Sequence, residues 1–137
     1  ITNVPYSRYT LHDYIANSAD DIYTDRQVRL VVENADGETV GVADLVRFDP
    51  QHGRAEAGII IMNSHRRRGY AREALQQLHD YALGTLHLHQ LYAIIASDNT
   101  VALHLFQQAG YQTAGRLRDW LMRGHKYVDA QIVQCFL

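Results

Sequence analysis

Residues 59–75 read IIIMNSHRRRGYAREAL, and this stretch decides which fold the rest of the chain can adopt. The run at 59–62 is apolar throughout, which is typical of the buried end of a β-strand. From Ala71 onward the apolar residues recur at helical spacing, so the chain changes from strand to helix across one short loop. We therefore expect a strand that ends near Met62 and a helix that opens at residues 66–71.

The expected opening of this helix has the chemistry of a phosphate site. Helix N-termini leave backbone N–H groups without partners, and the helix dipole adds positive potential there. Gly69 lets the backbone approach a ligand closely, and the three arginines at 66–68 add positive charge. Three arginines at a helix start are also a common solvated surface, and neither G-x-x-x-x-G-K-[ST] nor G-x-G-x-x-G occurs here. The stretch alone leaves both interpretations open.

Toward the N-terminus, the sequence predicts an antiparallel meander. Three stretches rich in β-branched and apolar residues lie at 29–33, 40–48 and 55–62. They are separated by turn signals at 34–37 and 49–53. Turns this short join neighbouring antiparallel strands, so the three strands should lie side by side.

Toward the C-terminus, the sequence predicts a crossover unit. The helical pattern runs from 71 to 82, and Gly84 is a plausible stop. Residues 91–96 form a short apolar run typical of a strand. Because a strand, a helix and a strand in succession form a crossover, 91–96 should lie parallel to 55–62.

A second helix and two further strands complete the pattern. Asn99 can cap this helix, and Ala102 and Phe106 belong to its apolar stripe. The last strands are expected at about 111–117 and 127–136. The predicted fold class is α/β (α+β), with a mixed, mostly antiparallel central sheet flanked by helices.

The start of the chain carries a weaker signal. Residues 9–17 show a short helical pattern with Leu11, Tyr14 and Ile15, so we expect a helix there. There is no repeat, low-complexity tract or Pro/Gly/Ser-rich linker. We therefore expect a single domain over residues 1–137.

Composition excludes several classes of partner. The 137 residues are 47% hydrophobic with a formal net charge of -2, so nothing global favours nucleic acid or an anionic membrane, and we expect neither as a partner. Cys135 is the single cysteine, which rules out a disulfide framework and makes a reducing cytoplasm the expected compartment. The eight histidines come with no H-E-x-x-H spacing and no cysteine partner, so no metal site is expected.

The order of motifs resembles the GNAT superfamily of N-acetyltransferases. Its coenzyme A signature, [QR]-x-x-G-x-[GA], is matched by RRRGYA at 66–71, after an apolar strand and at a helix start. Its later motifs N-x-x-[AS] and G-[FY] are matched at 99–102 and 110–111. The resemblance covers about 28–137 and is closest to two branches, the spermidine (diamine) acetyltransferases and the ribosomal-protein N-terminal acetyltransferases. The motifs do not separate these branches.

The resemblance implies where acetyl-CoA, the cosubstrate, binds. Its pyrophosphate would lie on the amides of 66–71, its pantetheine arm would pair with the strand ending at 60–62, and the second helix would contact the far side of the arm. The implied cofactor-binding residues are Ile60, Ile61, Met62, Arg66, Arg67, Arg68, Gly69, Tyr70, Ala71, Arg72, Asn99, Ala102 and Phe106.

The resemblance also implies acetyl transfer to a primary amine by direct attack. The amine must lose a proton, and a carboxylate usually accepts it. Glu56 lies on the expected cofactor strand and is the candidate catalytic base, with an ordinary exposed strand residue as the alternative. Many relatives place a tyrosine on the second helix to protonate the departing thiolate, but this chain has Phe106 there. Tyr70, Tyr111 or a water could take that role.

Several alternatives remain open at this level. The acceptor could be a polyamine, a protein N-terminus or a small metabolite. Phe106 also fits an acyl-CoA-binding sensor or regulatory domain with little or no turnover. Relatives carry a strand and a helix before the segment that Ile1 enters, so we expect a domain that lacks these two elements. The last strands often pair in this family, which makes a homodimer possible.

Overall fold

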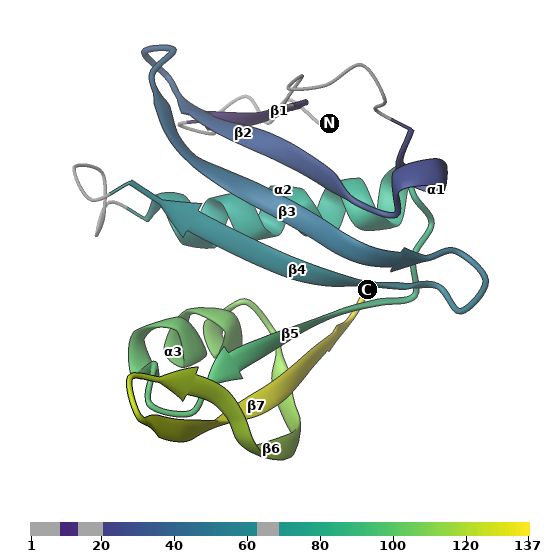
Figure 1. Ribbon diagram of the computed structural model, residues 1–137. Helices are drawn as coiled ribbons and strands as arrows, with labels where there is room; N and C mark the ends of the chain where they lie inside the picture. The colour runs from purple at the N-terminus through teal and green to yellow at the C-terminus, as the bar shows by residue number, and fades with distance from the viewer. Residues whose placement is uncertain (1–8, 14–20, 63–68) are drawn as a thin grey trace.

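The computed structural model describes residues 9–13, 21–62 and 69–137, with only the backbone described at 9–13. None of the described helices has the length and apolar character of a membrane span. The elements follow in the order β1 (Tyr9–Asp13), α1 (Ile22–Asp25), β2 (Val28–Asn34), β3 (Thr39–Asp49), β4 (Arg54–Ile61), α2 (Tyr70–Gly84), β5 (Gln90–Ala96), α3 (Thr100–Gln108), β6 (Gln112–Arg123) and β7 (Lys126–Phe136) (Figure 1).

One sheet contains all of these strands, in the spatial order β1-β2-β3-β4-β5-β7-β6. β4 and β5 are parallel, and every other neighbouring pair is antiparallel. α2 connects the two parallel strands, since a parallel connection must cross a face of the sheet. The predicted mixed, mostly antiparallel sheet is confirmed, and so is the parallel pairing across the first long helix.

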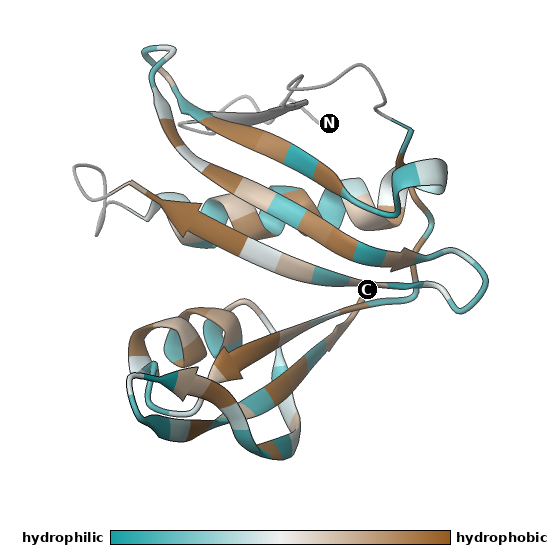
Figure 2. Cartoon of the chain, viewed as in Figure 1, coloured by the Kyte–Doolittle hydropathy of each residue, from teal (hydrophilic) through white to brown (hydrophobic). Residues whose placement is uncertain are grey.

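α2 packs on the first half of the sheet through a fully buried face made by Ala74, Leu75, Leu78 and Ala82. Figure 2 shows hydrophobic residues recurring along β2, β3 and β4. The buried residues of β2, β3 and β4 in the same core cluster are Leu30, Val32, Val40, Ala43, Leu45, Phe48, Ala55, Ala57 and Ile61, and β5 and β7 add Leu91, Ala93, Ile95, Val133 and Cys135. Each fully buried leucine contributes about 1.5–3 kcal/mol, so this face fixes where α2 begins and ends.

β3 and β4 approach each other at Gly41 too closely for any side chain. A Cβ at this position would lie 2.2 Å from the carbonyl oxygen of Ile60, far inside van der Waals contact. The glycine keeps the two strands paired as far as Gly41↔Ile61, the end of β4. The last residues of β4 are therefore held by β3, whatever lies on their other side.

The N-terminal segment differs from the sequence prediction. The pattern predicts a helix over 9–17, but Tyr9–Asp13 forms β1, with Asp13 opposite Leu30 of β2. The prediction is wrong for these residues, and 14–17 lie outside the described part of the chain. Three apolar positions are a weak helical signal. The edge of β2 has a row of backbone donors and acceptors, and pairing with it satisfies the backbone hydrogen-bonding groups of Tyr9–Asp13.

Candidate active site

The candidate site begins where β4 and β5 separate. The two strands pair over three positions, the last of which joins Glu56 to Tyr92. β4 then continues to Ile61 and β5 to Ala96, but the two strands no longer pair with each other. Figure 1 shows them diverging. Because β3 stays paired with β4, only the β5 side of β4 is open. This side offers backbone N–H and C=O groups with no strand partner, and an extended ligand can pair with such an edge.

Ile60 and Ile61, the last residues of β4, and Met62 just beyond it are the strand residues that the family resemblance assigns to the cosubstrate, and they lie at this open edge. The side chain of Ile61 is buried in the core, so only its backbone is accessible there. Ile60 is 61% exposed and Met62 is 50% exposed. Large apolar side chains this exposed are unusual beside an open strand edge, and they give the edge an apolar border.

The opening of α2 has no side-chain cap from its N-cap residue. Gly69 is the N-cap, with φ 78 and ψ 3, and no side chain there accepts a hydrogen bond from the first turn. Positive φ is strained for a side-chain-bearing residue, which explains the glycine. Tyr70 is buried and anchors the first turn, while Ala71 is half-buried. Arg66, Arg67 and Arg68 lie outside the described residues.

A pocket of about 470 Å³ lies beside this helix start. It is lined by Gly69, Arg72, Glu73, Gln76, Gln108 and Ala109. Arg72 donates a hydrogen bond from Nη1 to Oε1 of Gln108 at 3.5 Å, which links the first turn of α2 to the last turn of α3. The pocket is open and polar enough to take part of a hydrophilic ligand that reaches the α2 amides.

α3, the helix expected after Asn99, begins where the sequence predicts. The Oδ1 of Asn99 accepts a hydrogen bond from the backbone N–H of Ala102 at 3.1 Å, so Asn99 is its N-cap. Phe106 is only 4% exposed. Its ring packs edge-on against Tyr111, with ring centroids 4.9 Å apart. Phe106 therefore fills the core between α3 and the start of β6.

The described geometry argues against Tyr111 as the acid that replaces the missing tyrosine. Its hydroxyl lies 2.9 Å from Nε2 of His79, and both residues are buried. Burial raises the pKa of Tyr111 far above its usual value, so the hydroxyl keeps its proton. Tyr70 is buried as well. Of the substitutes considered from sequence, water is the one that needs no buried hydroxyl.

Glu56 is the last residue of β4 that pairs with β5, so it lies at the point where the two strands separate. Its Oε1 accepts a hydrogen bond from Nε of Arg47 at 3.1 Å, and its side chain is 21% exposed. Across the strands it faces Tyr92, whose pKa is raised first by burial and next by the charge of Glu56. A carboxylate with one hydrogen-bonded oxygen, beside an open strand edge, can accept a proton from a bound amine.

Sequence reasoning missed Arg47 as a neighbour of Glu56. The register of β3 against β4 shifts between Val46 and Asp49, and the backbone of Arg47 has φ 52. The Asp49-Pro50 turn signals a chain reversal but not a bulge two residues earlier. A left-handed arginine cannot be read from composition or periodicity, because both describe regular alternation.

Comparison with known proteins assigns the class. Residues 1–112 match a protein family described as an acetyltransferase (GNAT) domain. The chain therefore belongs to the GNAT family of acetyltransferases. The predicted family and its enzyme class, an N-acetyltransferase, are confirmed, and acetyl-CoA is the cosubstrate that membership implies.

Several of the relatives that match are named spermidine N(1)-acetyltransferases. The chain is 29% identical over 127 residues to spermidine N(1)-acetyltransferase of Vibrio cholerae serotype O1, covering 93% of this chain and 72% of that protein. It is 35% identical over 109 residues to the enzyme of that name from Escherichia coli K12, covering 80% of this chain and 58% of that protein. A dodecameric structure of the Vibrio cholerae enzyme has a TM-score of 0.79 at 30% identity, covering 84% and 67% of the two chains.

The buried His79 should make the fold sensitive to acid. Burial lowers the pKa of His79 below its ordinary 6.5, so the unfolded chain binds this proton more readily than the folded chain. Its contribution to stability is therefore complete above about pH 6.5 and is lost as the pH falls below that value. In urea unfolding, His79→Gln should lower stability by about 1 kcal/mol at pH 8 and should flatten the loss between pH 7 and pH 5.

His104→Gln is the matched control, because His104 is exposed on α3. This variant should keep the pH dependence of the parent. If His79→Gln loses stability with acid as steeply as the parent does, the buried histidine is not the source of the sensitivity.

Proposed function

We propose that this chain transfers an acetyl group from acetyl-CoA to a primary amine at the point where β4 and β5 separate. The observation that carries the proposal is the open edge of β4 beyond Glu56, with the α2 amides at one end and a carboxylate at the other. An extended thioester needs both a strand edge for its arm and a cationic end for its phosphates.

The cosubstrate residues of the proposal follow from this placement. Ile60, Ile61 and Met62 offer their backbone to the pantetheine arm. Gly69, Tyr70 and Ala71 offer their amides to the pyrophosphate, and Arg66, Arg67, Arg68 and Arg72 supply positive charge. Asn99, Ala102 and Phe106 belong to the helix that borders the arm from the β5 side. The glycine N-cap of α2 and the pocket at Arg72 support this assignment.

The proposed chemistry is a direct displacement. The amine nitrogen attacks the thioester carbonyl carbon, and its proton passes to Glu56, directly or through a water. A main-chain N–H of β4 stabilises the oxyanion of the tetrahedral intermediate. The carbon–sulfur bond then breaks, giving the N-acetyl amide and the coenzyme A thiolate, which takes a proton from water. A thiol pKa of about 8.5 makes this leaving group acceptable without a protein acid.

The acyl-CoA sensor is the weaker reading. Its support is Phe106, which lacks the proton that a tyrosine would supply. The relatives from Vibrio cholerae and Escherichia coli are both named as transferases. Release of coenzyme A thiol that requires an added amine distinguishes the enzyme from the sensor.

The expected compartment is part of this proposal. Cys135 is a buried free thiol, which is compatible with a reducing environment. We accordingly propose that the protein works in the cytoplasm.

Replacing Gly69 should abolish cosubstrate binding. In Gly69→Val a β-branched residue must adopt φ 78 at the helix start, and its side chain covers the first amides. Isothermal calorimetry should show at least about tenfold weaker acetyl-CoA binding than in the parent. Gly124→Val imposes similar strain at φ 64 in the β6–β7 turn and should bind like the parent. If both variants bind acetyl-CoA equally well, the N-terminus of α2 does not bind the cosubstrate.

Replacing Glu56 should slow acetyl transfer without weakening acetyl-CoA binding. Glu56→Gln keeps the size of the side chain but cannot accept the amine proton, so kcat/KM for the amine should fall about 100-fold at pH 8. The deficit should shrink toward pH 10, where an alkyl amine is increasingly deprotonated in solution. Asp44→Asn is the control, because Asp44 lies on β3 in an ion pair with Arg29. A Glu56→Gln variant with parental kcat/KM would exclude this residue as the base.

We also propose that the chain forms homo-oligomers through β6. β6 is the outermost strand on its side of the described sheet. Near the β6–β7 turn the exposed large apolar side chains are Trp120, Leu121, Met122 and Tyr127. A long apolar edge strand promotes pairing with another chain. The dodecameric state of the Vibrio cholerae relative supports a second copy as the occupant.

Charging this edge should separate the subunits. Sedimentation velocity should give a dimer or larger assembly for the parent and a monomer for the double variant Trp120→Glu, Met122→Glu. Leu83→Glu is the control, since Leu83 is an exposed apolar residue on α2. A parent that sediments as a monomer at every concentration would refute self-association.

A further inference from the structure

A bulge in β3 directs Arg47 toward Glu56. Two residues of β3, Arg47 and Phe48, stand opposite Ala55 alone, between the pairs Val46↔Glu56 and Asp49↔Arg54. Phe48 takes the buried position, so Arg47 is the extra residue, and its left-handed φ of 52 is unusual for a non-glycine. Such strain costs about 1–3 kcal/mol and concentrates at functional sites.

The guanidinium of Arg47 is largely available to a ligand. Its Nε donates to Oε1 of Glu56, and its side chain is 74% exposed. An arginine carries five N–H donors in a planar fork. Within the described part of the chain, the four donors on Nη1 and Nη2 have no partner, and they can bind a carboxylate through two parallel hydrogen bonds.

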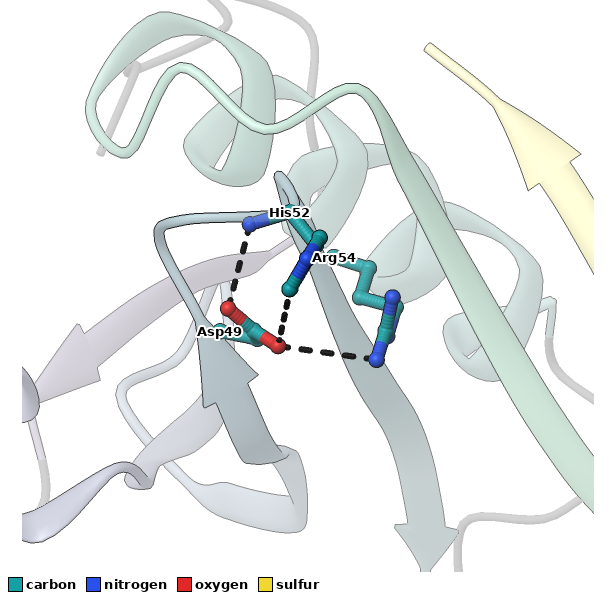
Figure 3. A network of polar contacts seen from close by, with 3 residues as sticks. All are labelled: Asp49, His52 and Arg54. Atoms are coloured by element: carbon teal, nitrogen blue, oxygen red, sulfur yellow. Dashed lines mark hydrogen bonds and ion pairs between the residues drawn. The ribbon is translucent and has the colours of Figure 1, made fainter.

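The neighbouring carboxylates are already paired with cations. Asp44 accepts two hydrogen bonds from Arg29, at 2.9 and 3.3 Å. Asp49 accepts from the backbone N–H of His52 and also contacts the His52 ring and Arg54 (Figure 3). The hydrogen bond with the His52 ring lowers the pKa of Asp49 most, and the bond from the His52 backbone N–H comes next. Both carboxylates are therefore neutralised by the chain itself.

Of Asp44, Asp49 and Glu56, only Glu56 keeps an oxygen without a partner among the described residues, namely Oε2. Glu56, Arg47, Arg54 and Asp49 all act electrostatically on Tyr92, which places these charges around the point where β4 and β5 separate. The point where β4 and β5 separate therefore has one carboxylate oxygen that can accept a proton from a single amine. The Nη1 and Nη2 groups of Arg47 lie beside this carboxylate. Among the described residues at this point, no second carboxylate keeps an unpaired oxygen for a second ammonium group.

We propose that Arg47 determines the charge of the acceptor, and that the acceptor is a primary amine that also carries a carboxylate. The amine lies at Oε2 of Glu56, and the carboxylate binds the Nη fork of Arg47. A polyamine such as spermidine, the acceptor named for the relatives, would bring a second ammonium next to this guanidinium. The inference rests on the proposed acetyl transfer and leaves its chemistry unchanged: the amine gains the acetyl group, and coenzyme A leaves as the thiol.

Three five-carbon amines test the proposal, because they differ only in the group at the far end. These are 5-aminopentanoate, pentylamine and 1,5-diaminopentane, assayed by thiol release with spermidine as a fourth acceptor. The parent should prefer 5-aminopentanoate, with kcat/KM at least about tenfold above that for the diamine, since hydrogen bonds between charged groups exceed the neutral case. Arg47→Gln should reduce this ratio about tenfold, and Arg47→Glu should invert it.

Ratios within one variant cancel any general loss of activity from a disturbed fold. Arg118→Gln removes the same charge from an exposed position on β6 and should leave the ratio at its parental value. A parent that prefers the diamine or spermidine overturns the inference, as does a ratio that Arg47→Gln does not move. A parent that binds acetyl-CoA but acetylates none of the four amines overturns the proposed function, and the inference with it.

Discussion

The separation of β4 from β5 is the constraint on which the site depends. Each strand is satisfied elsewhere: β4 pairs with β3 to its last residue, and β5 pairs with β7 along its whole length. Leu103 and Phe106 of α3 are buried beside the second half of the sheet and belong to the same core cluster as the residues under α2. Beyond the three pairs that β4 and β5 share, β4 follows the twist of β3 and β5 follows the twist of β7. Neither half needs the edge that a ligand would use.

The sequence predicted those features that burial and capping determine. The change of period between Met62 and Ala71 predicted the crossover, because an amphipathic helix must lie on a sheet face. Asn99 predicted its own helix start through a local hydrogen bond. The sequence could not predict that β4 and β5 stop pairing at Glu56, because periodicity indicates strand lengths but not strand partners. Nor could it predict β1, where the partner is the distant edge of β2.

The interior explains how the chain can dispense with a tyrosine acid on α3. Phe106 gives the same aromatic packing against Tyr111 that the core needs, without a hydroxyl that would have to find a partner. The hydroxyl of Tyr111 already bonds to His79, so the aromatic cluster holds α2, α3 and β6 together. What is lost is a proton donor for a thiolate, the half of the reaction that water can supply most easily. Removing a proton from the amine is harder without a protein group, and in the proposed function Glu56 accepts that proton.

Likeness to the spermidine enzymes speaks for the fold and the cosubstrate more strongly than for the acceptor. The residues that build the sheet are constrained by the core, where an added or lost methylene costs free energy. Arg47 is 74% exposed and stabilises little by itself, so its charge can change without unfolding the chain. A substitution at such a position alters which acceptor is attracted and leaves the pairing of β3 with β4 intact. Under the proposed function, acceptor choice depends on the local charge pairing around Glu56, and two proteins with the same sheet can differ there.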